Sequence, residues 1–451
     1  MIHTKNPYNN EPIASYAPHT DAQIEACIEK AHTTFSQWRG YGMEERLVPM
    51  GALAKLLLER SRRYASLMSQ EMGKPIQQAV AEVEKCVWLC DFYHENAEDF
   101  LADELIETEA GESFISYDPL GVVLGVMPWN YPFWQVLRFA VPTLLAGNTV
   151  LLKHASNVTG SALALEELFK EAGFPEAAFT TVLANHGQVA HIIAHAHVRA
   201  VSVTGSGTAG SHIAKLAGQF VKPSVMELGG NNACIVWEDA DLDAHMDTMV
   251  NARMQNTGQS CIAAKRFIVT EPIYDDFVAR FKEKLKNLKR GDPASEATDI
   301  GVMAREDLAR ELQQQVARSV EKGAVVTHGN TVEKAYYEPT LLENVRPGMP
   351  AFDEELFGPV AAVIKAKDRA ESLELAANSK FGLGTMLFTR DVEAARWAID
   401  QIPDGAFFVN DMVKSDPRLP FGGTKMSGYG RELSREGIHE FVNKKTVYLK
   451  P

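Results

Sequence analysis

The chain has 451 residues, of which 45% are hydrophobic and 23% charged, and its formal net charge is −14 at pH 7. This length is enough for two or three domains, and the acidic balance argues against nucleic acid or an anionic membrane as a main partner. No apolar run approaches the roughly 18 residues of a membrane span, and the N-terminus lacks signal-peptide features. The five cysteines show no disulfide or zinc spacing, so we expect no metal and a reducing cytoplasm as the location.

The first hundred residues are predicted to be mainly helical. Apolar residues recur at helical spacing over 21–38, over 44–71, where two helices are expected, and over 77–101. Cys86 and Cys90 stand four residues apart in the last segment, which places both thiols on one helix face. Packing in a core explains them better than redox chemistry does.

Short apolar strands then alternate with helices. Strands are expected at 121–127, 149–153, 179–183 and 198–204, and helices at 133–146, 160–171, 188–196 and 209–219. This alternation predicts βαβ units and a parallel sheet covered on both faces. Ligands bind such sheets beyond the carboxyl ends of the strands, where we find the turns 128–132, 153–157 and 204–208.

A second α/β region follows from about residue 229. Strands are expected at 233–237, 266–270 and 324–327, and helices at 242–254, 273–288 and 304–322. The C-terminal residues 444–450 are predicted to form a short edge strand, which would suit pairing with another subunit. The fold class is therefore α/β, with at least two domains.

Two turns could carry chemistry. Gly205-Ser206-Gly207 lies between a strand and a helix, and such a turn suits a pyrophosphate, although an ordinary turn is the alternative. Cys261 follows the glycine-containing turn 256–260, and a thiol there can be presented to a substrate. The alternative for Cys261 is a small buried apolar side chain, which is the usual state of a free cysteine.

Five motifs occur in one order along the chain: 126–130 (VMPWN), 226–231 (MELGGN), 258–261 (GQSC), 354–359 (EELFGP) and 420–428 (PFGGTKMSG). Together they resemble the NAD(P)-dependent aldehyde dehydrogenase superfamily, from about residue 7 to the C-terminus. The resemblance implies a Rossmann-like cofactor-binding domain over 1–228, a catalytic domain over 229–430, and a small β element for oligomerisation. That element comprises a hairpin near 101–120 and the segment 431–451, and the implied assembly is a homodimer or homotetramer.

The resemblance also assigns the catalytic groups. Cys261 matches the nucleophile, which forms a tetrahedral adduct with the aldehyde. The Asn130 amide, together with the Cys261 N–H, matches the oxyanion hole, and Glu227 matches the base that activates water. Elsewhere Asn130 would be a turn former and Glu227 a surface carboxylate. However, Glu227 stands between Met226 and Leu228 at the end of a strand, which is a poor position for a charge without a role.

Cofactor contacts follow from the same resemblance. Glu355 is expected to hold the nicotinamide ribose, and Phe357 to pack near the ring. The adenosine half is assigned to Trp129 and Lys153, and the pyrophosphate to Gly205, Ser206 and the following helix.

Ser156 bears on the choice between NAD and NADP. NAD-preferring relatives commonly carry a glutamate at this position, which binds the ribose 2′-hydroxyl and repels a 2′-phosphate. Ser156 removes that repulsion and Lys153 supplies positive charge, so NADP is favoured over NAD. The alternative is that Ser156 only caps a helix.

Arg138 is the most informative residue for the substrate. It lies on an otherwise apolar helix, eight residues after Asn130, and succinate-semialdehyde dehydrogenases place an arginine at the matching position to hold the distal carboxylate. Ser415 is a second candidate ligand. Gln255 departs from the pattern, because many of those relatives have another arginine there.

These residues predict an enzyme that oxidises an aldehyde, succinate semialdehyde in the first instance, to the acid with NAD(P)+. One alternative is a broad-specificity dehydrogenase for aliphatic or aromatic aldehydes, in which Arg138 pairs with a nearby glutamate. Another is a non-catalytic binding protein on the same scaffold, which predicts loss of Cys261, Glu227 or Asn130. A CoA-dependent acylating enzyme would not need the base Glu227.

Overall fold

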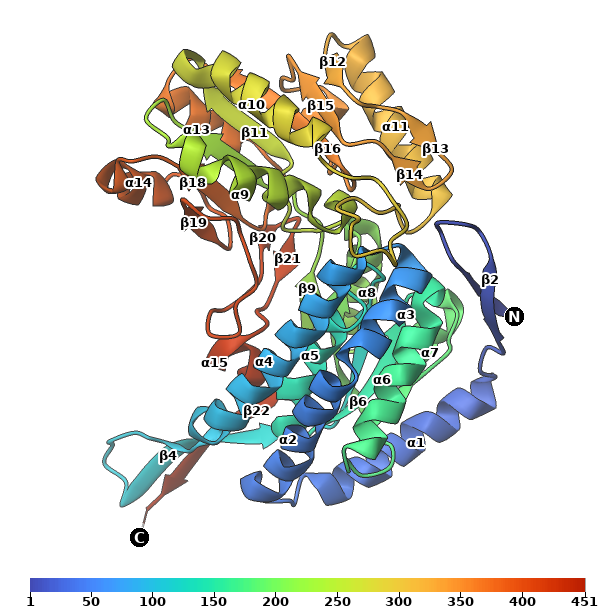
Figure 1. The fold of residues 1–451 in the computed structure, drawn as a ribbon. Coiled ribbons are helices and arrows are strands. Elements are labelled where there is room, and N and C mark those ends of the chain that lie inside the picture. The colour runs from blue at the N-terminus through green and yellow to red at the C-terminus, as the bar shows by residue number, and fades with distance from the viewer. Residues whose placement is uncertain (451) are drawn as a thin grey trace.

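Two sheets, each packed between helices, form the two halves of the structure, which is a computed structural model describing residues 1–450 (Figure 1). The six-stranded sheet belongs to the lower half in this view, and the seven-stranded sheet to the upper half. Separate groups of buried apolar side chains cover the opposite faces of each sheet. The predicted α/β class is confirmed.

The N-terminal region consists of a small hairpin and four helices. The hairpin pairs β1 (Ile2–Lys5) with β2 (Pro12–Tyr16), and the helices are α1 (Asp21–Trp38), α2 (Met43–Glu59), α3 (Ser61–Met72) and α4 (Ile76–Leu101). The helix α1 begins at Thr20 because Thr20 and Gln23 form a reciprocal capping box. The helix α3 ends at Gly73, whose φ of +76° favours glycine. All four helices confirm the periodicity read from the sequence.

The first sheet has the strand order β21-β9-β8-β5-β6-β7, and all its pairs are parallel except β21–β9. Its strands are β5 (Val122–Met127), β6 (Thr149–His154), β7 (Phe179–Thr181), β8 (Val198–Thr204), β9 (Ser224–Glu227) and β21 (Gly428–Tyr429). The crossover helices are α5 (Trp134–Leu145), α6 (Thr159–Glu171), α7 (His186–Ala194) and α8 (Gly207–Gln219). β21 is unexpected, and it brings the C-terminal region back onto the first domain beside Glu227.

The second sheet has the order β12-β15-β16-β11-β10-β18-β19, with only β12–β15 antiparallel. Its strands are β10 (Ala233–Val236), β11 (Arg266–Thr270), β12 (Val325–His328), β15 (Thr340–Glu343), β16 (Val360–Ala366), β18 (Thr385–Phe388) and β19 (Phe407–Val409). The helices α9 (Leu242–Met254), α10 (Tyr274–Lys286), α11 (Glu306–Glu321), α13 (Arg369–Ala377) and α14 (Val392–Ile399) pack around it. The sequence predicted no strand between residue 327 and the C-terminal segment 444–450, so the last four of these are new.

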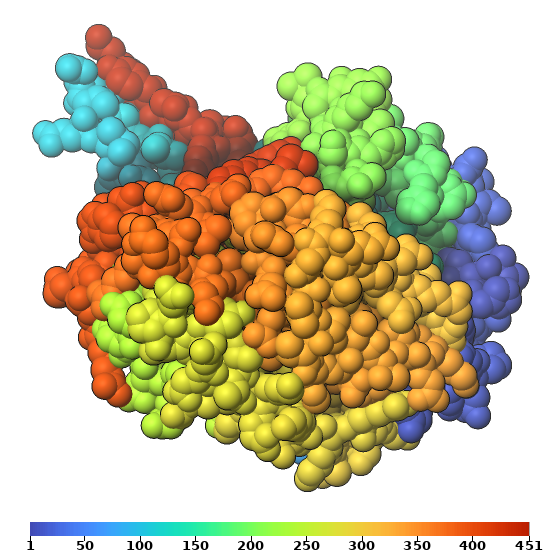
Figure 2. All heavy atoms as spheres, turned by 90° about the horizontal axis from the view of Figure 1, so that it is seen from above, coloured from blue at the N-terminus to red at the C-terminus, as the bar shows by residue number. Residues whose placement is uncertain are grey.

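A three-stranded arm projects from the first domain. It contains β3 (Glu104–Leu105), β4 (Glu112–Pro119) and β22 (Val442–Leu449), in the order β22-β4-β3. Figure 2 shows the cyan and red strands leaving the body together. The predicted C-terminal edge strand exists, but its partner is β4 of the same chain, paired from Val442–Pro119 to Leu449–Glu112. The other edge of β22 has no strand beside it in residues 1–450, and the oligomerisation role of the arm stays a prediction.

Candidate active site

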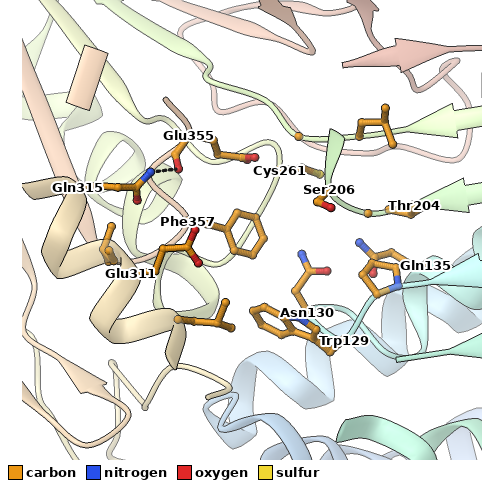
Figure 3. A pocket seen from close by; sticks show the side chains of 16 residues that line it. Trp129, Asn130, Gln135, Thr204, Ser206, Cys261, Glu311, Gln315, Glu355 and Phe357 are labelled. Atoms are coloured by element: carbon orange, nitrogen blue, oxygen red, sulfur yellow. Dashed lines mark hydrogen bonds between the residues drawn. The ribbon is translucent and has the colours of Figure 1, made fainter. Parts of the chain in front are cut away.

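A cavity of about 300 Å³ lies between the two domains. Trp129, Asn130, Gly205 and Ser206 line it from the first domain, beyond the carboxyl ends of β5 and β8. Cys261, Glu355 and Phe357 line it from the second domain. Figure 3 shows Phe357 and Glu355 on one side and Trp129, Asn130 and Thr204 opposite them. The structure therefore brings together candidates that lie up to 228 positions apart in the sequence (Trp129 to Phe357).

The loop that carries Cys261 has an unusual backbone. After α9 ends, Asn256 and Thr257 both have φ of about 55°, a left-handed conformation that is rare for a β-branched residue such as threonine. The Asn256 amide holds the turn by donating to the carbonyl of Asn130 at 2.8 Å. Gly258 also has positive φ, and a Cβ there would lie 2.4 Å from the backbone of Gly358. The strained backbone positions therefore lie in the turn that directly precedes Cys261.

Two buried cations fix the same loop, and the sequence did not single them out. Arg253 donates to the carbonyls of Gly258 at 2.7 Å and of Ala264 at 3.1 Å. Lys265 donates to the carbonyl of Cys261 at 2.7 Å and pairs with Glu355 at 2.9 Å. Because buried charges are tolerated only when they are paired or hydrogen-bonded, these contacts make the loop rigid. In the sequence, each of them stands as a basic residue within an apolar run, and this pattern could have drawn attention to both.

The surroundings of Cys261 favour the thiol over the thiolate. Burial raises its pKa to about 11, while the positive charges of Lys265 and Arg138 act in the opposite direction. The thiolate is the nucleophilic form, so most of the resting population is the unreactive thiol at neutral pH.

Asn130 lies against the nucleophile loop. Its side chain is 3% exposed, and its Nδ2 donates to the carbonyl of Gln259 at 3.0 Å. This contact uses one of its two N–H groups, and the amide lines the same cavity as Cys261. Asn130 is therefore placed to stabilise negative charge on an oxygen bound next to the sulfur.

Replacing Asn130 by alanine is expected to lower kcat by about 10²- to 10³-fold, because one oxyanion donor is worth that much in acyl transfer. Steady-state rates of the purified variant measure the loss. Asn251→Ala, on the exposed face of α9, is the matched control and should keep wild-type rates. A loss below threefold in Asn130→Ala would remove the amide from the oxyanion hole.

Glu227 is a buried carboxyl at the end of a strand of the first sheet. It ends β9, it is 3% exposed, and neither side-chain oxygen has a partner within residues 1–450. Burial, and secondarily the charge of Glu432, raises its pKa well above the ordinary value. An unsatisfied buried carboxyl destabilises a fold, so its presence indicates a role in chemistry.

Arg138 has a carboxylate partner inside the protein. It is 2% exposed, it forms an ion pair with Glu432, and its guanidinium lies 4.5 Å from the centre of the Phe421 ring. This is the contact that the broad-specificity alternative expected. The role of Arg138 as a substrate ligand stays a prediction, and Glu432 is a residue that sequence reasoning missed.

The other two substrate candidates lie in different surroundings. Ser415 is buried, and its hydroxyl accepts a hydrogen bond from the ammonium of Lys85 at 2.7 Å. Gln255 lines a separate cavity with Gln77 and Gln78 of α4, and it does not line the cavity that holds Cys261. Lys85 was not predicted, although a lysine between Val83 and Cys86 on an apolar helix face was a signal.

The remaining cavity residues fit a dinucleotide. The rings of Trp129 and Phe357 meet edge-on with centroids 5.8 Å apart. A Cβ added at Gly205 or Gly207 would meet no atom within 4 Å, so open space lies before the N-terminus of α8, where Ser206 is the N-cap. Unpaired N–H groups and the helix dipole at such a position favour phosphate.

The structure distinguishes the two adjacent glutamates of the 354–359 motif, because only Glu355 lines the cavity. Glu355 lines the cavity and accepts from the N–H of Gly230 at 3.1 Å. Glu354 instead pairs with Arg318 at 2.9 Å on the outside of α11. Lys153 and Ser156 share the wall of a smaller cavity at the end of β6, and burial lowers the pKa of Lys153.

The fold and this group of residues define an aldehyde dehydrogenase site, and the comparisons agree. The aldehyde dehydrogenase family model matches residues 1–447, so the chain belongs to that family. A Synechocystis protein named a probable succinate-semialdehyde dehydrogenase (NADP+) is 46% identical over 451 residues, with 99% of each chain covered. A Deinococcus radiodurans protein named a succinate-semialdehyde dehydrogenase (NADP+) is 42% identical, with 99% of this chain and 94% of its own length covered.

A solved structure is similar over the whole chain. Succinic semialdehyde dehydrogenase from Streptococcus pyogenes, in complex with NADP+, superposes with a TM-score of 0.98 at 34% identity, covering 100% of both chains. In residues 1–450, no helix has the length and apolar character that crossing a membrane requires.

Proposed function

We propose that this chain oxidises succinate semialdehyde to succinate with NADP+, and with NAD+ less efficiently. The oxidation rests on one observation: the partly exposed thiol of Cys261 shares a cavity with the Asn130 amide, while the buried carboxyl of Glu227 has no hydrogen-bond partner within residues 1–450. The full-length relatives named for this substrate support the choice of aldehyde.

Each step of the proposed reaction is assigned to particular residues of the chain. The Cys261 thiolate adds to the carbonyl carbon, and the oxygen becomes negative within reach of the Asn130 amide. A nicotinamide cofactor, held by Glu355, Phe357 and the N-terminus of α8, would supply the acceptor for the hydride that leaves this carbon, and a thioester would remain on Cys261. Glu227 then takes a proton from water, whose oxygen attacks the thioester, and the acid and the free thiol are released.

Initial rates with succinate semialdehyde and hexanal, each with NADP+ and NAD+, test the proposal. We expect a kcat/KM preference for succinate semialdehyde of about 100-fold, because one charge-assisted contact supplies roughly 2.7 kcal/mol. Equal rates, or a preference for hexanal, would leave an aldehyde dehydrogenase and remove the succinate-semialdehyde assignment.

A broad-specificity aldehyde dehydrogenase is the second candidate. The ion pair between Arg138 and Glu432 favours it, since a neutralised arginine attracts a carboxylate weakly. A salicylaldehyde dehydrogenase from Pseudomonas putida, solved with salicylaldehyde, has the same fold at 29% identity and a TM-score of 0.96.

Replacing Ser156 by glutamate is expected to lower kcat/KM for NADP+ by at least about tenfold and to change the NAD+ value little. The added carboxylate would face the ribose 2′-position beside Lys153, repelling a 2′-phosphate and accepting from a 2′-hydroxyl. Ser206→Ala, at the cap of α8, is the control that should affect both cofactors equally. An unchanged NADP+/NAD+ ratio in Ser156→Glu would contradict the placement of Ser156.

The proposal includes a cytoplasmic homodimer or homotetramer. The arm supports assembly, because Tyr448 and Leu449 of β22 are about half exposed next to a free strand edge. Sedimentation of the full chain beside a variant ending at residue 441 tests it, and a monomeric full-length chain would contradict it.

A further inference from the structure

Two helices that are distant in the sequence present metal-ligating side chains to each other. Glu25 and Glu29 stand four residues apart on α1, so they lie on one face of that helix. His191 and His195 are spaced in the same way at the end of α7, where His195 is the C-cap. Buried apolar side chains of both helices pack in one cluster, and this packing brings the acidic pair and the histidine pair together at the protein surface.

The possible ligand atoms of these four side chains lie close together. The Glu25 carboxylate has one oxygen 3.3 Å from His191 Nε2 and the other 3.0 Å from His195 Nε2. An oxygen of Glu29 lies 3.8 Å from His195 Nε2. Two ligand atoms of a tetrahedral zinc ion, each about 2.1 Å from the metal, are roughly 3.4 Å apart. The observed separations therefore suit ligands that share one cation, and the atoms of Glu25, Glu29 and His195 all lie within 4.8 Å of one another.

The two carboxylates have no permanent cation beside them. No lysine or arginine of residues 1–450 lies within ion-pair distance of Glu25 or Glu29, and their partners at that distance are all histidines. The nearby ammonium of Lys222 donates to the carbonyl of His195 at 2.6 Å instead. Imidazole binds metals in its neutral form and then leaves both carboxylate charges uncompensated, whereas a divalent cation would balance them.

Neighbouring groups orient the cluster. His197 Nε2 lies 3.4 Å from an oxygen of Glu29, and the His197 ring stacks on His32 with centroids 3.6 Å apart and planes 8° apart. Such outer contacts fix the groups that bind a metal. The N–H of His197 donates to His195 Nδ1 at 3.2 Å, so Nε2 carries the ring proton when it faces Glu25. A metal at Nε2 would move that proton to Nδ1 and break this contact, so we expect micromolar affinity and not the tighter binding of a closed structural zinc site.

We propose that Glu25, Glu29, His191 and His195 bind one divalent transition-metal ion, zinc in the first instance, which ties α1 to α7. Imidazole together with carboxylate suits zinc among such ions. The His191 side chain is 55% exposed, so its ring can turn to complete four ligands. None of these residues lines the cavity that holds Cys261. The histidines precede β8, whereas the cavity lies beyond the end of that strand, so the metal would stabilise the first domain without taking part in aldehyde oxidation.

Calorimetric titration of the full chain with zinc chloride tests the proposal, in a Cys27→Ala/Cys261→Ala background. This background removes the two partly exposed thiols, which would otherwise compete for zinc. We expect one zinc ion per chain with a micromolar dissociation constant at about pH 7.5. Zinc at about 100 times that constant should raise the melting temperature by about 2–3 °C, because it binds the folded state alone.

Two variants remove one ligand each, and one variant is the matched control. Glu25→Gln keeps the shape of the side chain on an exposed helix face and should weaken zinc binding by at least about tenfold, with loss of the melting shift. His191→Gln should have the same effect while leaving Glu25 in place. The control is His94→Gln, since His94 is an exposed histidine beside the carboxylates of Asp91 and Glu95 on α4. It should bind zinc as the background protein does.

Three results would overturn the proposal. The first is no binding of zinc up to about 1 mM. The second is unchanged affinity in either Glu25→Gln or His191→Gln, because the ion would then bind elsewhere. The third is an equal loss in His94→Gln, since adventitious binding to surface histidines would then explain the titration.

Discussion

Cys261→Ala should reduce aldehyde oxidation by about 10⁴-fold or more, as expected when the nucleophile of a covalent mechanism is removed. The fold should survive, because Cys261 is only partly buried and alanine fits its place. The measurement is the steady-state rate with saturating aldehyde and cofactor. Cys27→Ala is the matched control, since Cys27 is the other partly buried thiol and lies on α1, outside the cavity.

The same thiol gives a pH prediction with a definite sign. Burial raises the pKa of Cys261 to about 11, so the thiolate fraction grows with pH throughout the neutral and mildly alkaline range. Alkylation by iodoacetamide, in the cofactor-free Cys27→Ala protein, should therefore accelerate about tenfold per pH unit between pH 7 and 10. The other cysteines are buried. A plateau below pH 9 would show that the loop already stabilises the thiolate before any ligand binds.

Elements that depend on contacts between residues close in sequence were predicted, whereas elements that depend on contacts between distant residues were not. The helices at 21–38 and 242–254 and the strands at 198–204 and 266–270 follow from periodicity, because that signal is local. β21 has two residues and exists only because residues 428–429 meet β9. Hydrophobic periodicity is a local signal, so it cannot predict that Gly428 pairs with Glu227, which is far away in the sequence.

The same distinction between local and distant contacts applies to the residues of the candidate active site. Cys261, Asn130 and Glu355 belong to local motifs, so the sequence pointed to them and the structure places them around one cavity. The partners that decide what each charge does are distant in sequence: Glu432 for Arg138, and Ser415 for Lys85. Arg138 alone in an apolar helix indicated that an anion must be near, but it could not distinguish a substrate from a glutamate of the same chain.

The second large effect is expected for Glu227→Gln, which should lower kcat by about 10³-fold, within the range that general bases contribute. The loss should fall on hydrolysis of the thioester alone. A rapid burst of one reduced cofactor per active site should therefore persist, because Cys261 and Asn130 are untouched. Stopped-flow absorbance measures the burst. Loss of the burst together with the steady-state rate would place Glu227 in the first half-reaction instead.

Stability gives an independent reading of the same variant. The pKa of Glu227 is raised in the folded state, so between the ordinary value near 4.5 and that raised value the folded protein holds a proton that the unfolded chain has released. This group's contribution to the free energy of unfolding is thus largest at low pH and declines as pH rises through the folded pKa.

Glutamine cannot ionise, so Glu227→Gln should melt at a higher temperature than the wild type at pH 8, with a smaller difference at pH 5. Glu440→Gln, at a partly buried neighbour whose carboxylate accepts from the N–H of Arg431, should show a smaller gain, because the ionised form of Glu440 keeps a hydrogen-bond donor in the fold. A variant that is slower yet more stable at pH 8 is the combination expected of a carboxyl kept unpartnered for catalysis, whereas a purely structural carboxyl would lose stability on the same change.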